Sequence, residues 1–227
     1  MPNWVFNGLT IEGNKDQVTK LIEQMNTPFV GYVEPNGDLA YSVSSRKYPN
    51  PVFAFRNIIA PTDIDAYLKQ PEFDPTQPMF SGDDWYNWNN REWGTKWDVA
   101  NVEGSENTYM EEWDNGDNKV VYYNFDTAWS APFPAIAKLS AQYPNLLFSL
   151  SYKEEGGWGG EAEYLRGVQI SENTYDNKCE ACEFEFADED RKEDCEECYG
   201  TVCPRCSFSY ELCQTHLLEY QTTQEVK

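Results

Sequence analysis

The chain has 227 residues, of which 40% are hydrophobic and 15% aromatic. This is enough for one large domain or a medium and a small one, and it excludes a wholly disordered chain. The 39 acidic and 17 basic side chains give a formal net charge of −22. Such a surface repels phosphate backbones and membranes and attracts basic partners, so direct nucleic-acid binding is not expected. With no signal peptide and no long apolar run, we expect a cytoplasmic protein without membrane spans.

The first 28 residues predict a strand followed by a helix. Apolar residues alternate from Trp4 to Ile11, and the pattern ends at Gly13. Asn14 is a suitable N-cap for a helix with apolar residues at positions 18, 21, 22 and 25. The sequence Thr27-Pro28 ends that helix, because proline disfavours helical backbone in the residue before it.

Residues 29–60 alternate apolar stretches with turn residues, and residues 35–38 predict a turn that joins two strands into a hairpin. Residues 61–63 predict the start of a short helix. Residues 71–82 are rich in Pro, Asp and Gly and indicate an exposed loop.

A tryptophan-rich helix is predicted next, beginning at Asp83-Asp84 and ending near Gly94. Trp85 and Trp88 share one face at helical spacing, so we expect most of these indoles in the core, with a recognition surface as the alternative. Lys96 is expected to pack or to make a cation–π contact rather than to act as a catalytic amine.

The remainder of the first 170 residues predicts strands around one more helix. Thr127 or Ser130 opens that helix, which has Pro132 in its first turn and ends at 143–145. A reversal is expected at 156–160. The predicted strands cover residues 97–103, 107–113, 119–125, a segment beginning at 147, and 162–170.

This order of elements predicts an α+β fold of the ferredoxin-like (split β-α-β) type, with an antiparallel sheet and helices on one face. We expect three parts: a ferredoxin-like domain over 1–170, a small zinc-stabilised domain over 171–220 and a tail over 221–227.

Several motifs resemble one known family. The motifs are Pro2-Asn3-Trp4 with Asn7, Leu9, Ile11 and Gly13; Trp85-Tyr86-x-Trp88; Trp93 to Asp98; Phe125 to Pro132; and Gly157 to Glu161. Over residues 1–170 the chain resembles the YubB-type family, whose members have a ferredoxin-like domain and are found on phages, plasmids and pathogenicity islands. The resemblance implies this fold and a mobile-element origin, with no catalytic assignment. Ala131 departs from the family pattern, in which a proline is expected.

All seven cysteines and the single histidine of the chain lie in residues 179–216. They form four pairs with two residues inside each pair and gaps of twelve, four and six residues between pairs. The predicted metal ligands are Cys179, Cys182, Cys195, Cys198, Cys203, Cys206, Cys213 and His216.

This spacing predicts two closed, structural zinc sites. Two intervening residues let a tight turn direct both ligands at one ion, and two such turns complete a tetrahedron with Zn–S distances of about 2.3 Å. One site has four cysteines and the other has three cysteines and His216. The pairing is either interleaved, as in RING-like modules, or sequential. Metal binding would supply the stability that so short a segment lacks.

Three functions are compatible with the sequence. The first is a non-enzymatic accessory protein of a phage or mobile element that binds a protein in the host cytoplasm. The second is an acidic nucleic-acid mimic that inhibits a host DNA-binding or defence enzyme. The third is a carboxylate- or metal-dependent enzyme such as a nuclease. Zinc binding would occupy every cysteine and His216, which leaves no histidine base or thiol nucleophile, so we expect no catalytic residues of those types.

Overall fold

The structure, a computed structural model, describes residues 3–32, 45–69 and 74–175. The chain divides into two units, Met1–Glu154 with Gly160–Asn173, and Glu155–Gly159 with Thr174–Lys227. Most of the second unit lies outside the described residues, so the fold below is essentially that of the first. None of the described helices is long and apolar enough to cross a membrane.

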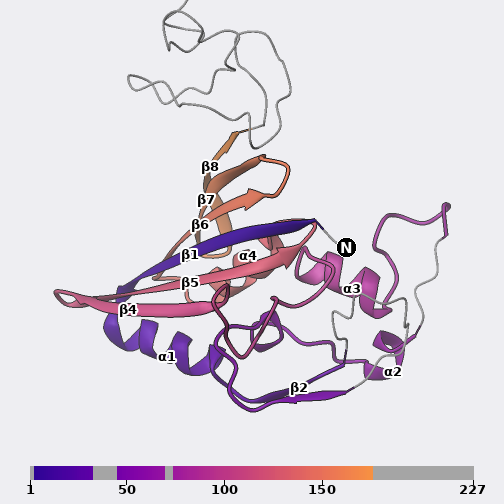
Figure 1. Cartoon of the computed structure of the whole chain (residues 1–227), viewed down its shortest axis with the longest axis horizontal. Helices are drawn as coiled ribbons and strands as arrows, with labels where there is room; N and C mark the ends of the chain where they lie inside the picture. Colours follow the sequence, from indigo (N-terminus) through magenta and orange to yellow (C-terminus); the bar gives the residue numbers. More distant parts are fainter. Residues whose placement is uncertain (1–2, 33–44, 70–73, 176–227) are drawn as a thin grey trace, which may run out of the picture. The chain divides into compact units, whose positions relative to one another are not determined.

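A six-stranded sheet in the order β4-β5-β1-β6-β7-β8 forms the framework (Figure 1). Strand β1 pairs antiparallel with both β5 and β6, and β4 pairs antiparallel with β5. The strands are β1 (Trp4–Asn14), β4 (Tyr109–Asn115), β5 (Asn118–Ala128), β6 (Leu147–Glu154), β7 (Gly159–Leu165) and β8 (Val168–Tyr175).

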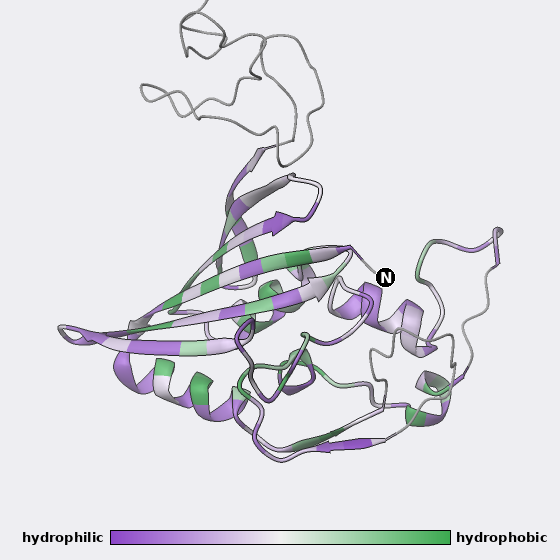
Figure 2. Ribbon diagram, in the orientation of Figure 1, coloured by the Kyte–Doolittle hydropathy of each residue, from purple (hydrophilic) through white to green (hydrophobic). Residues whose placement is uncertain are grey.

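Helix α1 (Lys15–Met25) follows β1 directly, as predicted. The Asn14 side chain caps it by accepting hydrogen bonds from the backbone N–H groups of Asp16 and Gln17, at 3.1 and 3.3 Å. Val18, Leu21 and Met25 are buried on one side of this helix. Figure 2 shows hydrophobic and hydrophilic residues mixed along α1, as expected of an amphipathic helix at a surface.

Helix α4 (Phe133–Gln142) starts later than predicted. Its N-cap is Pro132, which provides no side-chain cap, and neither Thr127 nor Ser130 caps it. The Thr127 hydroxyl instead donates to the Ser130 carbonyl at 2.8 Å, closing a turn between β5 and the helix. Local hydrogen bonding by hydroxyl side chains therefore replaced the predicted cap.

The elements β1-α1-β4-β5-α4-β6 have the ferredoxin-like order, with the sheet arranged β4-β5-β1-β6. Helices α1 and α4 both bury side chains in the core. Alternate residues of the strands, among them Leu9, Tyr123 and Leu150, point into the same core. The predicted α+β fold, an antiparallel sheet with helices on one face, is confirmed.

A long insertion between α1 and β4 packs on that core. Its elements are β2 (Phe29–Gly31), β3 (Arg46–Tyr48), the 3₁₀ turn η1 (Phe55–Asn57), α2 (Ile64–Tyr67) and α3 (Trp85–Glu92). Strands β2 and β3 pair antiparallel, as the predicted hairpin requires, although its turn at 35–38 lies outside the described residues. Helices α2 and α3 are capped by Asp63 and Asp84.

Two predicted strands were wrong. Residues 97–103 form turns rather than a strand, because the Asp98 carboxylate binds the N–H groups of Phe55, Arg56 and Val99 and holds the chain in a bend. The segment 162–170, predicted as a single strand, is divided between two strands, β7 and β8. Arg166 and Gly167 both have positive φ, 57° and 79°, as a two-residue type I′ turn requires.

Candidate functional site

Residues from four of the five motifs, far apart in sequence, meet beside the end of β5. We name the tryptophan–lysine cluster by its five residues, Trp4, Tyr86, Lys96, Trp97 and Trp129. The ring centroids of Trp4 and Trp97 are 6.4 Å apart, and those of Tyr86 and Trp129 are 6.2 Å apart. The cluster thus combines the start of β1, helix α3, the segment after α3 and the end of β5.

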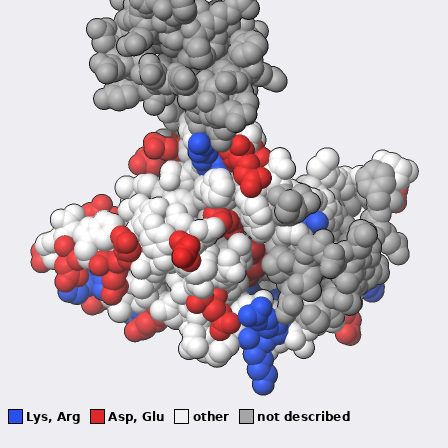
Figure 3. All heavy atoms as spheres, in the orientation of Figure 1, with Lys and Arg blue, Asp and Glu red and all other residues white. Residues whose placement is uncertain are grey.

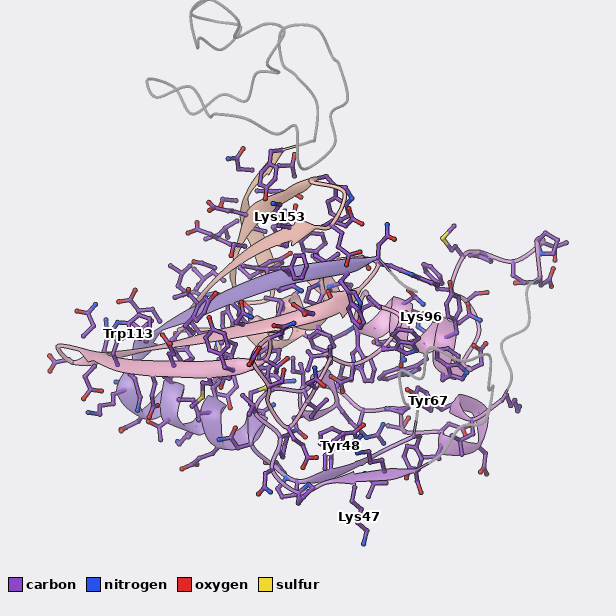
Figure 4. The ribbon with its side chains drawn as sticks, in the orientation of Figure 1. Lys47, Tyr48, Tyr67, Lys96, Trp113 and Lys153 are labelled. Carbon is purple, nitrogen blue, oxygen red and sulfur yellow. The ribbon has the colours of Figure 1, made fainter. Side chains whose placement is uncertain are left out.

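Lys96 bridges the two halves of the cluster. Its Nζ lies 4.5 Å from the Trp97 ring centroid and 4.4 Å from that of Trp129, so it makes two cation–π contacts, the role expected for it. Partial burial lowers the pKa of the Lys96 amine. Figure 4 places Lys96 beside α3.

Hydrogen bonds fix the segment that carries Lys96. Asn89, fully buried in α3, donates from Nδ2 to the Lys96 carbonyl at 2.9 Å. The Asn89 Oδ1 accepts from the Tyr67 hydroxyl at 2.8 Å. The buried Thr95 hydroxyl donates to the Trp97 carbonyl at 2.6 Å. Lys96 therefore extends from a backbone held by buried groups.

A second network fixes the segment that carries Trp129. The Asn7 Nδ2 donates to the Thr127 hydroxyl at 2.9 Å, which donates in turn to the Ser130 carbonyl. The Ser130 hydroxyl donates to the Gly94 carbonyl. The chain of hydrogen bonds links β1, the end of β5 and the segment after α3, so it sets the position of Trp129 relative to Lys96.

The eight tryptophans divide between core and surface. Trp85, Trp93 and Trp97 are buried, and the Trp93 indole N–H donates to the Ile59 carbonyl at 3.1 Å, as expected for core indoles. Trp113 and Trp129 are 48% and 43% exposed. The expectation of core indoles therefore holds for part of the set, and the recognition-surface alternative stays a prediction for the exposed ones.

A second candidate is the sheet face opposite the core, which we name the open face. It is formed by Phe6, Gly8, Thr10, Glu12, Tyr109, Glu111, Trp113, Val120, Tyr122 and Asn124, which alternate with the inward-facing residues of β1, β4 and β5. Phe6 is 45% and Tyr109 38% exposed. The Tyr109 and Tyr122 ring centroids are 6.2 Å apart.

Gly8 lets an aromatic ring lie close to β1 on the open face. A Cβ at this position would lie 2.9 Å from the Tyr122 hydroxyl and 2.8 Å from the Ser151 hydroxyl. Tyr122 therefore covers the backbone of β1. The strand predicted over 107–113 would place Tyr109, Glu111 and Trp113 on one face by alternation, but the sequence alone does not show which face has the helices.

The open face contains acidic groups with different partners. Glu12 accepts a hydrogen bond from Asn115 at 3.1 Å, whereas Glu111 is exposed and has no ion pair among the described residues. The nearby hairpin acids Glu112 and Asp114 are neutralised by Lys119 and Lys15, at 2.8 and 2.7 Å. Figure 3 shows a group of acidic side chains over the β4–β5 hairpin.

Two cavities adjoin α3. One, of about 20 Å³, is lined by polar groups that include Tyr48, Arg56, Tyr67 and Asp98, and its volume suits about one water molecule. The other is an open groove of about 890 Å³ along the loop before α3, with Tyr86 in its wall. Tyr86 thus belongs to both this groove and the tryptophan–lysine cluster.

The predicted zinc ligands, from Cys179 to His216, all lie outside the described residues. Within residues 3–32, 45–69 and 74–175, no group of three or more His, Cys, Asp or Glu side chains is arranged to hold a metal ion.

Comparison with known proteins gives one family match. Residues 108–198 match the family described as the ferredoxin-like domain in Api92-like protein. The matched segment includes five of the six strands of the sheet, and central β1 precedes it. No curated protein matches. The crystal structure of a protein api92 from Yersinia pseudotuberculosis aligns with 12% identity and a TM-score of 0.39, over 78% of this chain and 99% of that one.

The Api92-like match confirms the ferredoxin-like part of the predicted resemblance. It includes Tyr109, Trp113 and Trp129, so it covers much of the open face and one wall of the cluster. It leaves out Trp4, Tyr86 and Lys96, which the fold brings to Trp129 from the preceding part of the chain.

Proposed function

We propose that the protein is a non-enzymatic binding protein that holds a basic segment of a partner protein on its open face. The observation that carries the proposal is the row of exposed aromatic side chains, Phe6, Tyr109 and Trp113, on a sheet face opposite the helices. Exposed aromatic residues are common anchors of protein interfaces.

Charge indicates which partner the open face suits. Glu111 has no ion-pair partner among the described residues, and the chain as a whole has a net charge of −22. Arg and Lys side chains bind both to carboxylates and to the faces of aromatic rings. A basic segment therefore satisfies the acids and the rings together, whereas a phosphate backbone would be repelled.

The resemblance to YubB-type proteins supports a phage or other mobile element as the source of the protein. On this proposal the partner is a host protein in the host cytoplasm. A basic nucleic-acid-binding surface of a host enzyme is one kind of partner that fits, and the protein would then act as an acidic mimic.

A synthetic peptide of alternating Arg and Gly tests the proposal, with a citrulline peptide of the same length as the neutral control. The full-length protein should bind the Arg peptide, and binding should weaken as salt increases. Trp113→Ala with Tyr109→Ala should weaken binding by about 1 to 2 kcal/mol, roughly five- to thirtyfold, because two cation–π contacts of about 0.5–1 kcal/mol each are lost.

Met79→Ala is the matched control, since it removes an apolar side chain that is 82% exposed on a loop outside the sheet. Its affinity should equal that of the unmodified protein. Equal binding of the citrulline peptide, or full binding by the double variant, would exclude the open face as the binding site for a basic segment. The same variants in affinity purification from host cells should separate a specific basic partner from adventitious proteins.

We also propose two structural zinc ions held by the eight ligands between Cys179 and His216. The regular pair spacing supports this, because four ligand pairs complete two tetrahedral sites. Metal analysis of protein purified in reducing buffer should find close to two zinc ions per chain. One ion or none would contradict the proposal.

A further inference from the structure

Lys96 is a cation without an anion. Among the described residues, Lys96 Nζ contacts the rings of Trp97 and Trp129, and it has no ion pair or hydrogen bond there. Burial lowers the pKa of the Lys96 amine, and no neighbouring carboxylate opposes this shift. An ammonium has three N–H donors. In a chain with 39 acids and 17 bases, leaving those donors unpaired between two indoles is unusual.

Trp129 is held in a backbone conformation that a bulky residue rarely adopts. Its φ is 75°, in the left-handed region, where a bulky side chain strains the backbone. Strain of this type persists where surrounding contacts enforce it, and it is frequent at ligand sites. The hydrogen bonds of Thr127 and Ser130 enforce it here, and they leave the Trp129 ring 43% exposed over Lys96.

We propose that the tryptophan–lysine cluster is a binding site for a carboxylate carried beside an aromatic or apolar group. The carboxylate accepts hydrogen bonds from Lys96 Nζ, and the adjoining ring packs on Trp129 and Tyr86. This site is separate from the open-face anchor Trp113, since Figure 4 shows Lys96 and Trp113 near opposite ends of the sheet.

The geometry favours one small anion over a polyanion. The net charge of −22 repels a nucleic-acid backbone far more than a single carboxylate, because the repulsion grows with the charge of the ligand, and Lys96 offsets it locally. The ring centroids of Phe80 and Tyr86 are 6.1 Å apart, so aromatic walls continue from the cluster toward the groove of about 890 Å³. That groove has the size of a ligand site and gives the apolar part of the ligand room.

The direct probe is N-acetyl-L-phenylalanine, and its amide is the neutral control. Titrated into the full-length protein, the acid should shift the Trp129 indole N–H signal in NMR spectra and saturate at a Kd on the order of millimolar. The amide should bind at least about tenfold more weakly, because it lacks the charge that pairs with Lys96.

Three variants assign the effect to the cluster. Lys96→Met keeps the apolar stem and should lose at least about tenfold in affinity for the acid, with no change for the amide. Lys96→Arg should retain binding, because a guanidinium also stacks on indoles and binds carboxylates. Trp129→Gly suits the left-handed backbone, so it should fold and still lose binding.

Lys47→Met is the control for net charge, since Lys47 is exposed on β3 and its loss changes the charge by the same amount. It should bind the acid normally. Equal affinity of acid and amide, unchanged binding by Lys96→Met, or no saturable shift would each overturn the proposal.

A further comparison identifies the source of the carboxylate. If Gly-Gly-Phe with a free C-terminus binds at least about tenfold more tightly than N-acetyl-L-phenylalanine, the site recognises a peptide terminus. If the two bind equally, it recognises a small aromatic acid. Both results support a carboxylate site, and inorganic phosphate that competed as strongly as the acid would contradict the requirement for an aromatic group.

Discussion

Asn89 holds Lys96 in place from inside the protein. The Asn89 Nδ2 donates to the Lys96 carbonyl at 2.9 Å, while the Asn89 Oδ1 accepts from the Tyr67 hydroxyl at 2.8 Å. One fully buried amide thereby joins α2, α3 and the segment after α3. Burial raises the pKa of Tyr67, so this phenol remains a hydrogen-bond donor.

Asn89→Ala should therefore destabilise the protein and loosen Lys96. It leaves the Tyr67 hydroxyl and the Lys96 carbonyl without their partner, at a cost of about 1–3 kcal/mol for each buried group. The Lys96 carbonyl is only partly buried and should contribute about 1 kcal/mol, so chemical denaturation should show a total loss of about 2–4 kcal/mol. Asn90→Ala, which removes a bond to the Tyr86 carbonyl from a partly buried position on the same helix, is the control. A similar loss in the two variants would show that Asn89 has no special role.

Gly94→Ala should also be costly, because Gly94 ends α3 in the left-handed conformation and packs closely. Its φ is 85°, and an added Cβ would overlap with Pro134 at the start of α4. We expect a loss of about 2–4 kcal/mol, from backbone strain of about 1 kcal/mol and from displaced packing.

Gly116→Ala separates these two causes. Gly116 has φ 63° in the β4–β5 turn, and nothing lies within 4 Å of an added Cβ there. This variant should lose only about 1 kcal/mol, the strain part alone. Thermal or chemical unfolding measures both variants. If Gly116→Ala were the more destabilising, close packing against Pro134 would not add to the cost at Gly94.

Asp98 should make stability depend on pH. Burial raises the pKa of its carboxyl to about 6 from the ordinary 3.8, against the opposing effect of three backbone N–H bonds and Arg56. Below pH 3.8 the carboxyl is protonated in both states, and between 3.8 and 6 the folded state alone keeps the proton. Proton binding by Asp98 therefore stabilises the folded state at low pH. This part of the free energy of unfolding is lost as pH rises through 6, by at most about 3 kcal/mol and by less where water reaches the carboxylate.

Unfolding free energies measured from pH 4 to pH 7 test this, with Asp98→Asn as the comparison. Asparagine does not titrate, so the variant should lack the part of the pH dependence that Asp98 contributes. It should also be less stable at every pH above 6, because its amide N–H₂ faces backbone N–H donors. Parallel pH profiles for the two proteins would show that Asp98 does not titrate in this range.

The parts of the fold that local chemistry determines were predictable. Alternation in β1, the Asn14 cap of α1 and the Asp84 cap of α3 are each properties of a few adjacent residues. Residues 97–103 resemble a strand because Val99 and Val102 are apolar, but both are buried from turns that the Asp98 carboxylate holds. A side chain that binds backbone groups over 40 residues away leaves no local signal.

The candidate sites show the same limit. Lys96 was expected to make a cation–π contact because Trp97 is its neighbour, and that contact forms. The contact with Trp129 could not be predicted, since it depends on the pairing of β1 with β5 and on a positive φ that a tryptophan rarely adopts. Likewise, the helices pack on one face of the sheet, and this determines which aromatic residues of β4 are exposed.

Cys203→Ser tests the zinc prediction by changing one ligand. A serine hydroxyl is a much poorer zinc ligand than a thiolate, so one of the two predicted sites should lose its ion. Metal analysis should fall from about two zinc ions per chain to about one, or lower if the two sites depend on each other. Near-UV circular dichroism from the tryptophans, all of which precede residue 171, should stay unchanged if the ferredoxin-like domain folds independently of the metal. Ser207→Ala is the control, because it changes an adjacent residue outside the ligand set and should leave two ions bound. An unchanged zinc content in Cys203→Ser would show that Cys203 is not a ligand, and it would contradict the prediction of two closed sites.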